Sequence, residues 1–311
     1  QANNLNKNTF QKVAKSYIDE NQSSWRSNVT KKQWPNSLRD YVYPIMGSKP
    51  VHLITIHDVL SVLRPIWSEK TTTATRVRSR IENILDYATT LEMRQGNNPA
   101  VWRGNLSKVL PAPKKVHKIK SHSAVSYTEL HSFLMELRKR KGVGARALEF
   151  TILTGSRTRP LLLAKWEDID FDNAIWNCPE DNMKSGNFFR IPLSEPAMNI
   201  INSQKKYSRG DYIFGHEQTG KKSSNNCMLY TIYRMGYRGK VTTHGMRSTM
   251  RDWAGETTKY SERIVEVCLD HTVNNANQAA YQRGDYLIKR REIMDGWGRF
   301  CYPSENKVIH I

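Results

Sequence analysis

Thr242-Thr243-His244-Gly245-Met246-Arg247 is the segment that decides the fold class of this chain, and Leu269-Asp270-His271 and Ala279-Ala280-Tyr281-Gln282-Arg283 complete it. His244 and Arg247 are three positions apart, so they share one face if this segment is a helix. An arginine and two histidines can bind the oxygens of a phosphodiester, and the phenol oxygen of a tyrosine can attack its phosphorus. We therefore expect His244, Arg247, His271 and Tyr281 to form one site, which the rest of the chain completes.

The composition favours a DNA partner. The chain has 311 residues and a formal net charge of +19, and such an excess of Lys and Arg is typical of surfaces that bind a polyanion. An ordinary basic enzyme is the alternative. No apolar run approaches the ~18 residues of a membrane span. Because the chain starts at Gln1 without an initiator Met or a signal peptide, we expect a fragment of a longer cytoplasmic protein.

Neither a metal site nor a disulfide framework is expected. The four cysteines are widely separated and form no Cys-x-x-Cys pair; they are Cys178, Cys227, Cys268 and Cys301. Reduced thiols are the default in a cytoplasmic protein. The sequence also contains no carboxylate cluster that indicates Mg²⁺ beside the expected site, so no cofactor is predicted.

Residues 1–110 are expected to form a small helical domain. Apolar residues recur with a helical period after Thr9, around Trp34, after Thr55 and from about 74 to 91. Thr55 and Asp58 have the spacing of a capping box. The last of these helices carries Arg76, Arg78 and Arg80, which we expect to contact DNA phosphates. The alternative is a solvated helix face.

A basic linker is expected at residues 111–125. It has little apolar content, and its prolines favour an extended chain. Its lysines are candidate phosphate contacts: Lys114, Lys115, Lys118 and Lys120. A hinge between two domains that close around DNA needs such a segment.

Residues 126–311 are expected to form a second domain, mainly α with a small antiparallel β-sheet. Helical patterns follow Ser126 and cover about 146–153, 161–166, 194–206, 224–236, 244–256, 261–269 and 285–297. The strand patterns are 174–178 and 188–193. Gly186 lies between them and indicates a hairpin, with Lys184 on or beside its tip.

The spacing of these residues resembles that of the tyrosine recombinases, the phage integrase family. Thr154-Gly155-Ser156-Arg157, followed nine residues after the arginine by Trp166-Glu167-Asp168-Ile169-Asp170, resembles the family's first conserved box. His244-Gly245-Met246-Arg247 resembles the second box, and Lys184, His271 and Tyr281 match its lysine, its second histidine and its nucleophile. Integrases of satellite phages and genomic islands are especially similar, through segments 279–287, 43–47 and 64–67.

The resemblance implies a fold and a mechanism. The fold is a helical core-binding (SAM-like) domain joined to a catalytic domain of the DNA breaking-rejoining type. Tyr281 would become linked to the 3′ phosphate, and Arg157 and Arg247 would hold its oxygens. Lys184 would protonate the leaving oxygen, with Lys165 and Lys221 as weaker candidates. His244 would assist the tyrosine proton or bind the phosphate, and His271 would bind a non-bridging oxygen.

Two positions depart from the family pattern. The family usually has an acidic residue three positions after the first arginine, where this chain has Pro160. The residue before the last histidine is commonly Gly or Ala, and here it is Asp270. We expect Asp270 either to point away from the site or to raise the pKa of His271.

The resemblance also implies the partners and the biological role. We expect a site-specific recombinase of a bacterial mobile element, acting as a homotetramer on double-stranded DNA attachment sites. Accessory DNA-bending and directionality proteins are possible further partners. Subunits would exchange their C-terminal segments, here about 298–311. The alternatives are a type IB topoisomerase-like enzyme and a DNA-binding remnant that no longer cleaves.

Overall fold

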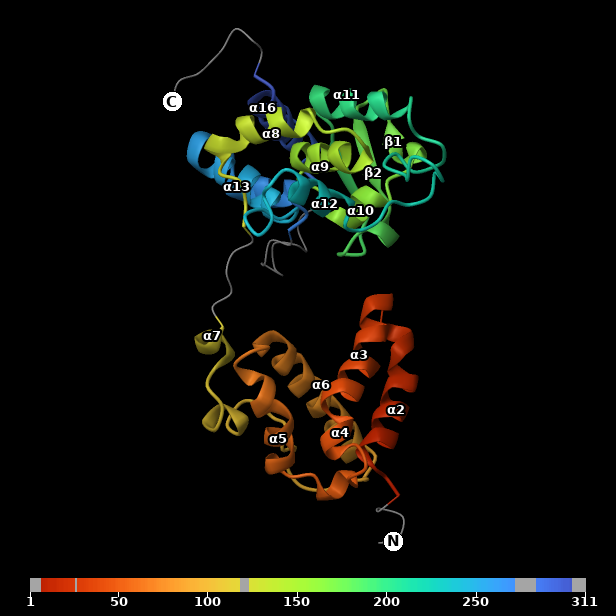
Figure 1. Cartoon of the computed structure of the whole chain (residues 1–311), viewed down its shortest axis with the longest axis vertical. Coiled ribbons are helices and arrows are strands. Elements are labelled where there is room, and N and C mark those ends of the chain that lie inside the picture. The colour runs from red at the N-terminus through yellow and green to blue at the C-terminus, as the bar shows by residue number, and fades with distance from the viewer. Residues whose placement is uncertain (1–6, 26, 118–122, 272–283, 304–311) are drawn as a thin grey trace. The chain divides into compact units, whose positions relative to one another are not determined.

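The computed structural model describes residues 7–25, 27–117, 123–271 and 284–303. Internal contacts divide the chain into two compact units, Gln1–Ile119 and Lys120–Ile311 (Figure 1). Each unit has its own hydrophobic core. Each is therefore described by itself.

The first unit is helical. Its helices are α2 (Phe10–Asn21), α3 (Asn28–Tyr41), α4 (Tyr43–Met46), α5 (Ile56–Trp67), α6 (Thr71–Thr90) and α7 (Pro113–Val116). Helix α6 packs against α2, α3, α5 and α7, so four helices surround it. Helix α5 begins with the expected capping box, in which the Asp58 carboxylate accepts from the backbone N–H of Thr55 at 2.8 Å.

The second unit combines helices with a small sheet. Its helices are α8 (Leu130–Arg138), α9 (Val143–Thr154), α10 (Thr158–Leu162), α11 (Glu195–Gln204), α12 (Cys227–Arg234), α13 (Gly245–Thr257), α14 (Glu262–Cys268) and α16 (Leu287–Cys301). Strands β1 (Ile169–Asp170), β2 (Ile175–Cys178) and β3 (Phe189–Pro192) pair antiparallel in the order β1-β2-β3. The expected mainly α chain with a small antiparallel sheet is confirmed.

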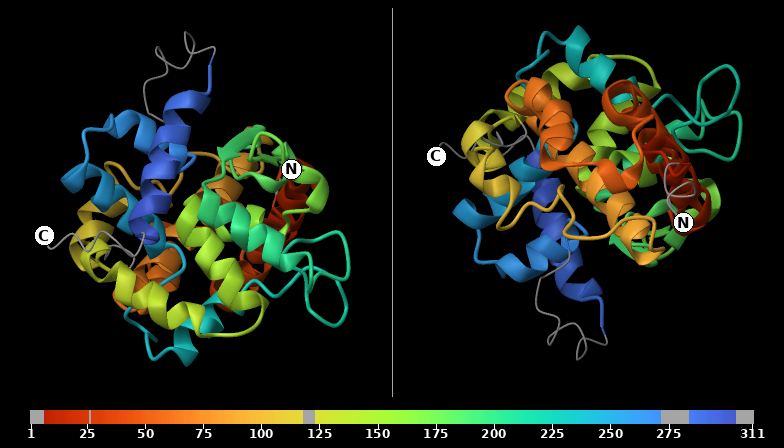
Figure 2. Two further views of the ribbon diagram at one scale, coloured as in Figure 1. Left: turned by 90° about the horizontal axis from the view of Figure 1, so that it is seen from above. Right: turned by 90° about the horizontal axis from the view of Figure 1, so that it is seen from below.

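Two helices hold the second unit together. Helix α9 is buried over nearly its whole length. Helix α16 packs against α9, α11, α14 and β3 (Figure 2). The fully buried Trp297 of α16 donates its indole N–H to the carbonyl of Ile152 at 2.7 Å. The C-terminal helix therefore belongs to the core.

One expected helix was misplaced. The sequence predicted residues 161–166, whereas α10 begins at Thr158 and ends at Leu162. Pro160 lies at the third helical position, where its missing N–H has no intrahelical partner to lose. Residues Trp166–Asp168 form a short 3-10 turn instead and lead into β1, a strand that the sequence did not predict.

Candidate active site

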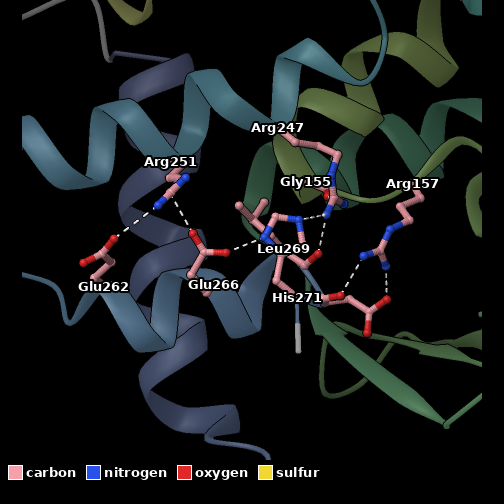
Figure 3. Close-up of polar contacts among 9 residues, drawn as sticks. Gly155, Arg157, Arg247, Arg251, Glu262, Glu266, Leu269 and His271 are labelled. Atoms are coloured by element: carbon pink, nitrogen blue, oxygen red, sulfur yellow. Dashed lines mark hydrogen bonds and ion pairs between the residues drawn. The ribbon is translucent and has the colours of Figure 1, made fainter. Parts of the chain in front are cut away.

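Arg247 lies at the centre of the candidate site (Figure 3). It is on the first turn of α13 and only 3% exposed. Its guanidinium donates to the backbone carbonyls of Gly155 and Leu269. Its Nη2 also lies 2.9 Å from Nε2 of His271. One side chain thus joins the ends of α9 and α14 to α13.

The surroundings of Arg247 disfavour its positive charge and lower its pKa. Burial and the nearby charge of Arg157 lower the pKa of Arg247 to about 10, while the carboxylates of Asp270 and Glu266 act in the opposite direction. The guanidinium is still protonated at neutral pH. Two arginines therefore bring positive charge close together, and two carboxylates partly balance it.

His271 is oriented through both ring nitrogens. Its Nδ1 contacts the carboxylate of Glu266 on α14, and its Nε2 contacts Arg247. An arginine can only donate and an ionised carboxylate can only accept. The proton of a neutral His271 is therefore on Nδ1, and Nε2 accepts from Arg247.

Glu266 extends this network away from the site (Figure 3). Its second oxygen forms an ion pair with Nε of Arg251 at 2.7 Å, and Arg251 also reaches Glu262 at 3.2 Å. Glu266 and Arg251 were not predicted from the sequence. Glu266 lies five residues before His271, and Arg251 lies four residues after Arg247. These spacings were the signal that the sequence offered.

Arg157 is held by Asp270. It is the residue before α10 and has extended backbone angles. Two residues earlier, Gly155 ends α9 with φ +60°. A Cβ at Gly155 would approach Leu269 within 2.8 Å, so the close packing of these two boxes depends on glycine. Nη1 of Arg157 pairs with the Asp270 carboxylate, and Nη2 donates to the Asp270 carbonyl at 2.7 Å. The expectation that Asp270 points away is therefore wrong.

A small pocket separates the arginines from the β2–β3 hairpin. Its lining includes Arg157, Pro160, Met183, Arg247 and Asp270. Lys184 follows Met183 directly and is exposed, in the loop that joins β2 to β3. Gly186 adopts φ +73° in this loop, as its proposed place at the hairpin tip requires.

His244 is exposed and precedes the first residue of α13, so it lies beside the positive end of that helix. The next residue, Gly245, packs against the chain that enters the second unit. A Cβ there would clash with the carbonyl of Ser123. That carbonyl also accepts from the N–H of Thr242 at 2.9 Å. The start of α13 is thus fixed by the end of the linker.

Tyr281 lies outside the described residues, but the chain is anchored on both sides of 272–283. Before this segment, Asp270 pairs with Arg157. After this segment, Asp285 pairs with Nε of Arg190 on β3 at 2.9 Å. Arg290, which is fully buried, donates to the carbonyls of Asp285 and Arg190.

The candidate DNA-binding residues have different surroundings. Arg80 is 9% exposed and donates to the carbonyl of Gln33 at 2.8 Å, so it is committed to the core of the first unit. Arg78 pairs with Glu82 at 2.6 Å. Arg76 is exposed, as are Lys114 and Lys115 on α7. Lys118 and Lys120 lie outside the described residues.

Comparisons with known proteins match this arrangement. The model of the phage integrase central domain matches residues 10–105. The model of the phage integrase family matches residues 124–285, more than half of the chain. The chain belongs to the phage integrase family. It is a tyrosine-type site-specific recombinase, as the spacing of its boxes predicted.

Relatives of this integrase-family chain are similar over most of its length. Prophage integrase IntZ of Escherichia coli K12 is 28% identical, with 93% of this chain and 70% of that protein covered. The integrase of Enterobacteria phage P4 is 26% identical, with 100% and 73% covered.

Solved structures of integrases share the fold of this chain. A lambda integrase (75-356) dimer bound to a COC′ core site has a TM-score of 0.68 at 17% identity, covering 85% of this chain and 95% of that one. A lambda integrase tetramer bound to a Holliday junction has a TM-score of 0.69 at 16% identity, covering 87% and 80%. These similarities show the tyrosine-recombinase fold.

The described residues contain no group of three or more His, Cys, Asp or Glu side chains placed to hold a metal ion. No helix among them is long and apolar enough to cross a membrane.

Proposed function

We propose that this chain integrates and excises a mobile DNA element by cutting and rejoining DNA through a 3′-phosphotyrosyl intermediate. The observation that supports this best is the convergence of Arg157, Arg247 and His271. They come from three separate segments of the second unit. Arg157 and Arg247 line one small pocket, and His271 contacts Arg247. Such a cluster of fixed donors suits a phosphate whose charge increases during attack.

The proposed roles follow from the chemistry of each side chain. The phenol oxygen of Tyr281 forms a bond to phosphorus, and the bond from phosphorus to the 5′ oxygen breaks. Lys184 gives its proton to the leaving 5′ oxygen, and His244 assists removal of the phenol proton.

The arginines and His271 serve the phosphate itself. Arg157 and Arg247 bind non-bridging oxygens as planar forks. His271 donates to another oxygen from Nε2, which requires a second proton on the ring and the release of its contact with Arg247. Attack by a 5′ hydroxyl on the tyrosyl ester reverses the step, so the energy of the broken bond is conserved without ATP.

The proposed partner is double-stranded DNA at two attachment sites, held by a homotetramer in the bacterial cytoplasm. The net charge of +19 supports a phosphate-rich partner. Among the described residues, the candidates for phosphate contacts are the exposed Arg76, Lys114 and Lys115. Lys118 and Lys120, outside the described residues, are further candidates. Accessory DNA-bending and directionality proteins would select integration or excision.

A plasmid recombination assay tests this proposal. The attachment sites are taken from the direct repeats that flank the coding gene, and both are placed on one plasmid. We expect excision of the intervening DNA by the wild-type chain and none by Tyr281→Phe. Relaxation of a plasmid without these sites, at an equal rate, would favour a topoisomerase. DNA binding without any strand exchange or cleavage would favour a decayed remnant.

A further inference from the structure

Asp270 is a carboxylate inside a site that must bind a phosphate. It belongs to the turn after α14 and adopts φ +50°, a left-handed conformation that costs free energy for residues other than Gly, Asn and Asp. Its side chain is only 16% exposed. Both its carboxylate and its carbonyl oxygen accept hydrogen bonds from Arg157. The left-handed turn and the two bonds together fix this acid on one arginine.

Helix α10 cannot supply an acid to Arg157 in this chain. Pro160 occupies the third position of α10 and is buried in the pocket that Arg157 and Asp270 also line. It has neither a polar side chain nor a backbone N–H. The carboxylate that contacts Arg157 therefore comes from the other wall of the pocket, next to His271.

We propose that Asp270 is a positioning residue, which holds the guanidinium of Arg157 in the orientation that receives the phosphate. This inference rests on the proposed function. A guanidinium has five N–H groups, and Asp270 accepts from one on each terminal nitrogen. Within the described part of the chain the remaining N–H groups, including that on Nε, have no hydrogen-bond partner, so they can donate to phosphate oxygens. Asp270 thus restrains Arg157 without using up its donors.

The charge of Asp270 supports the same role. Arg157 and Arg247 line one pocket, and two positive charges at this range repel each other. A carboxylate beside Arg157 offsets this repulsion before DNA arrives. It also acts to keep the pKa of Arg247 from falling further. When the phosphate binds, it meets an arginine, Arg157, that is already in place.

Asp270→Asn is the variant that isolates the carboxylate charge. Asparagine has the same shape and tolerates a positive φ, so the turn after α14 can keep its conformation. With saturating protein on a nicked attachment-site substrate, we expect cleavage to slow about 10-fold to 100-fold, as when a catalytic group is misplaced. DNA affinity should change less than about twofold. Faster cleavage would mean that Asp270 blocks Arg157, and would overturn the proposal.

A double-mutant cycle tests whether Asp270 acts through Arg157. In an Arg157→Lys background, Asp270→Asn should slow cleavage less than about twofold further, because the side chain that it positions is gone. The same fold-change in both backgrounds would overturn the proposal. Glu136→Gln is the matched control, since Glu136 on α8 pairs with Arg140, an exposed residue just after that helix. It should leave the rate unchanged.

A chemical readout separates this inference from the proposed function, because it requires no cleavage. Arginines are labelled with a dicarbonyl reagent in the DNA-free protein, and the peptides are quantified by mass spectrometry. We expect Arg157 to react several-fold faster in Asp270→Asn than in the wild type, relative to the exposed Arg159. An unchanged ratio would overturn the positioning role even if the wild type recombines DNA. A wild type that fails to cleave would contradict the proposed function alone.

Discussion

At the scale of single residues, the orientation of His271 depends on Glu266. The carboxylate binds Nδ1 and is itself held by Arg251. Partners that orient a functional histidine in this way typically change activity by about 10-fold to 100-fold when removed. We expect Glu266→Gln to slow cleavage by about tenfold at saturating DNA, with little change in DNA affinity.

The matched control for this prediction is Glu262→Gln. Glu262 also pairs with Arg251, but its side chain is 80% exposed and it pairs at 3.2 Å. We expect a change of less than about twofold, as for most exposed ion pairs. Equal losses of rate in the two variants would indicate that Arg251, and not the ring of His271, is what Glu266 serves.

At the scale of elements, α13 offers two glycines with opposite surroundings. Gly245 begins the helix against the carbonyl of Ser123, whereas no atom would lie within 4 Å of a Cβ at Gly255. Gly245→Ala should lower both the melting temperature and the cleavage rate, because the start of α13 carries His244 and Arg247. Gly255→Ala should stabilise the protein by about 0.5–1 kcal/mol through helix propensity. Thermal unfolding of both variants tests this, and a stable Gly245→Ala protein would contradict it.

Helix α16 begins beside an ion pair whose strength depends on pH. Partial burial acts to raise the pKa of Asp285, but hydrogen bonding and charge from Arg190, with the charge of Arg290, bring that pKa below its usual value. A carboxyl with a lowered folded-state pKa stabilises the fold above its unfolded pKa and loses this effect as pH falls through the folded pKa. Asp285→Asn should therefore reduce the free energy of unfolding at pH 7 by about 0.5–1 kcal/mol.

The expected pH window for that difference is specific. Urea unfolding should give the same difference at pH 7 and pH 5, and it should disappear as the pH falls below the usual aspartate range. Asp172→Asn, in an exposed turn of the same unit, is the control and should change stability little at either pH. A difference for Asp285→Asn that grows on acidification would contradict the account.

At the scale of the whole molecule, the positive charge should act through particular lysines. Lys114 and Lys115 are exposed next to the connection between the two units. If each contacts one phosphate, Lys114→Ala/Lys115→Ala reduces the slope of log affinity against log salt by about 2. Lys139→Ala/Lys141→Ala makes the same change in charge after α8. Fluorescence anisotropy at several salt concentrations compares them, and equal slopes for the two variants would argue against a local contact.

The sequence predicted most of the elements, because caps and apolar periodicity are local signals. Thr55 with Asp58 shows this for α5. It also predicted that Arg157, Arg247 and His271 meet, from the identity and order of the boxes. Charge runs were less informative: Arg80 looked like a phosphate contact, but it faces the first unit's core, which only the packing of α3 reveals.

The contact between Asp270 and Arg157 could not have been predicted from sequence spacing. It joins residues 113 positions apart. It also depends on the positive φ of Asp270 and on the extended backbone of Arg157 after Gly155. The same applies to Glu266, whose direction toward His271 is set by the end of α14. Side-chain direction at the end of a helix is a property of tertiary structure.

The most direct test of the central claim is to identify the residue that becomes linked to DNA. The chain is incubated with a nicked attachment-site duplex, digested with protease, and the DNA-linked peptide is sequenced by mass spectrometry. We expect a 3′-phosphate ester on Tyr281, absent in Tyr281→Phe and unchanged in Tyr286→Phe. A link to any other residue, or an adduct that persists in Tyr281→Phe, would contradict it.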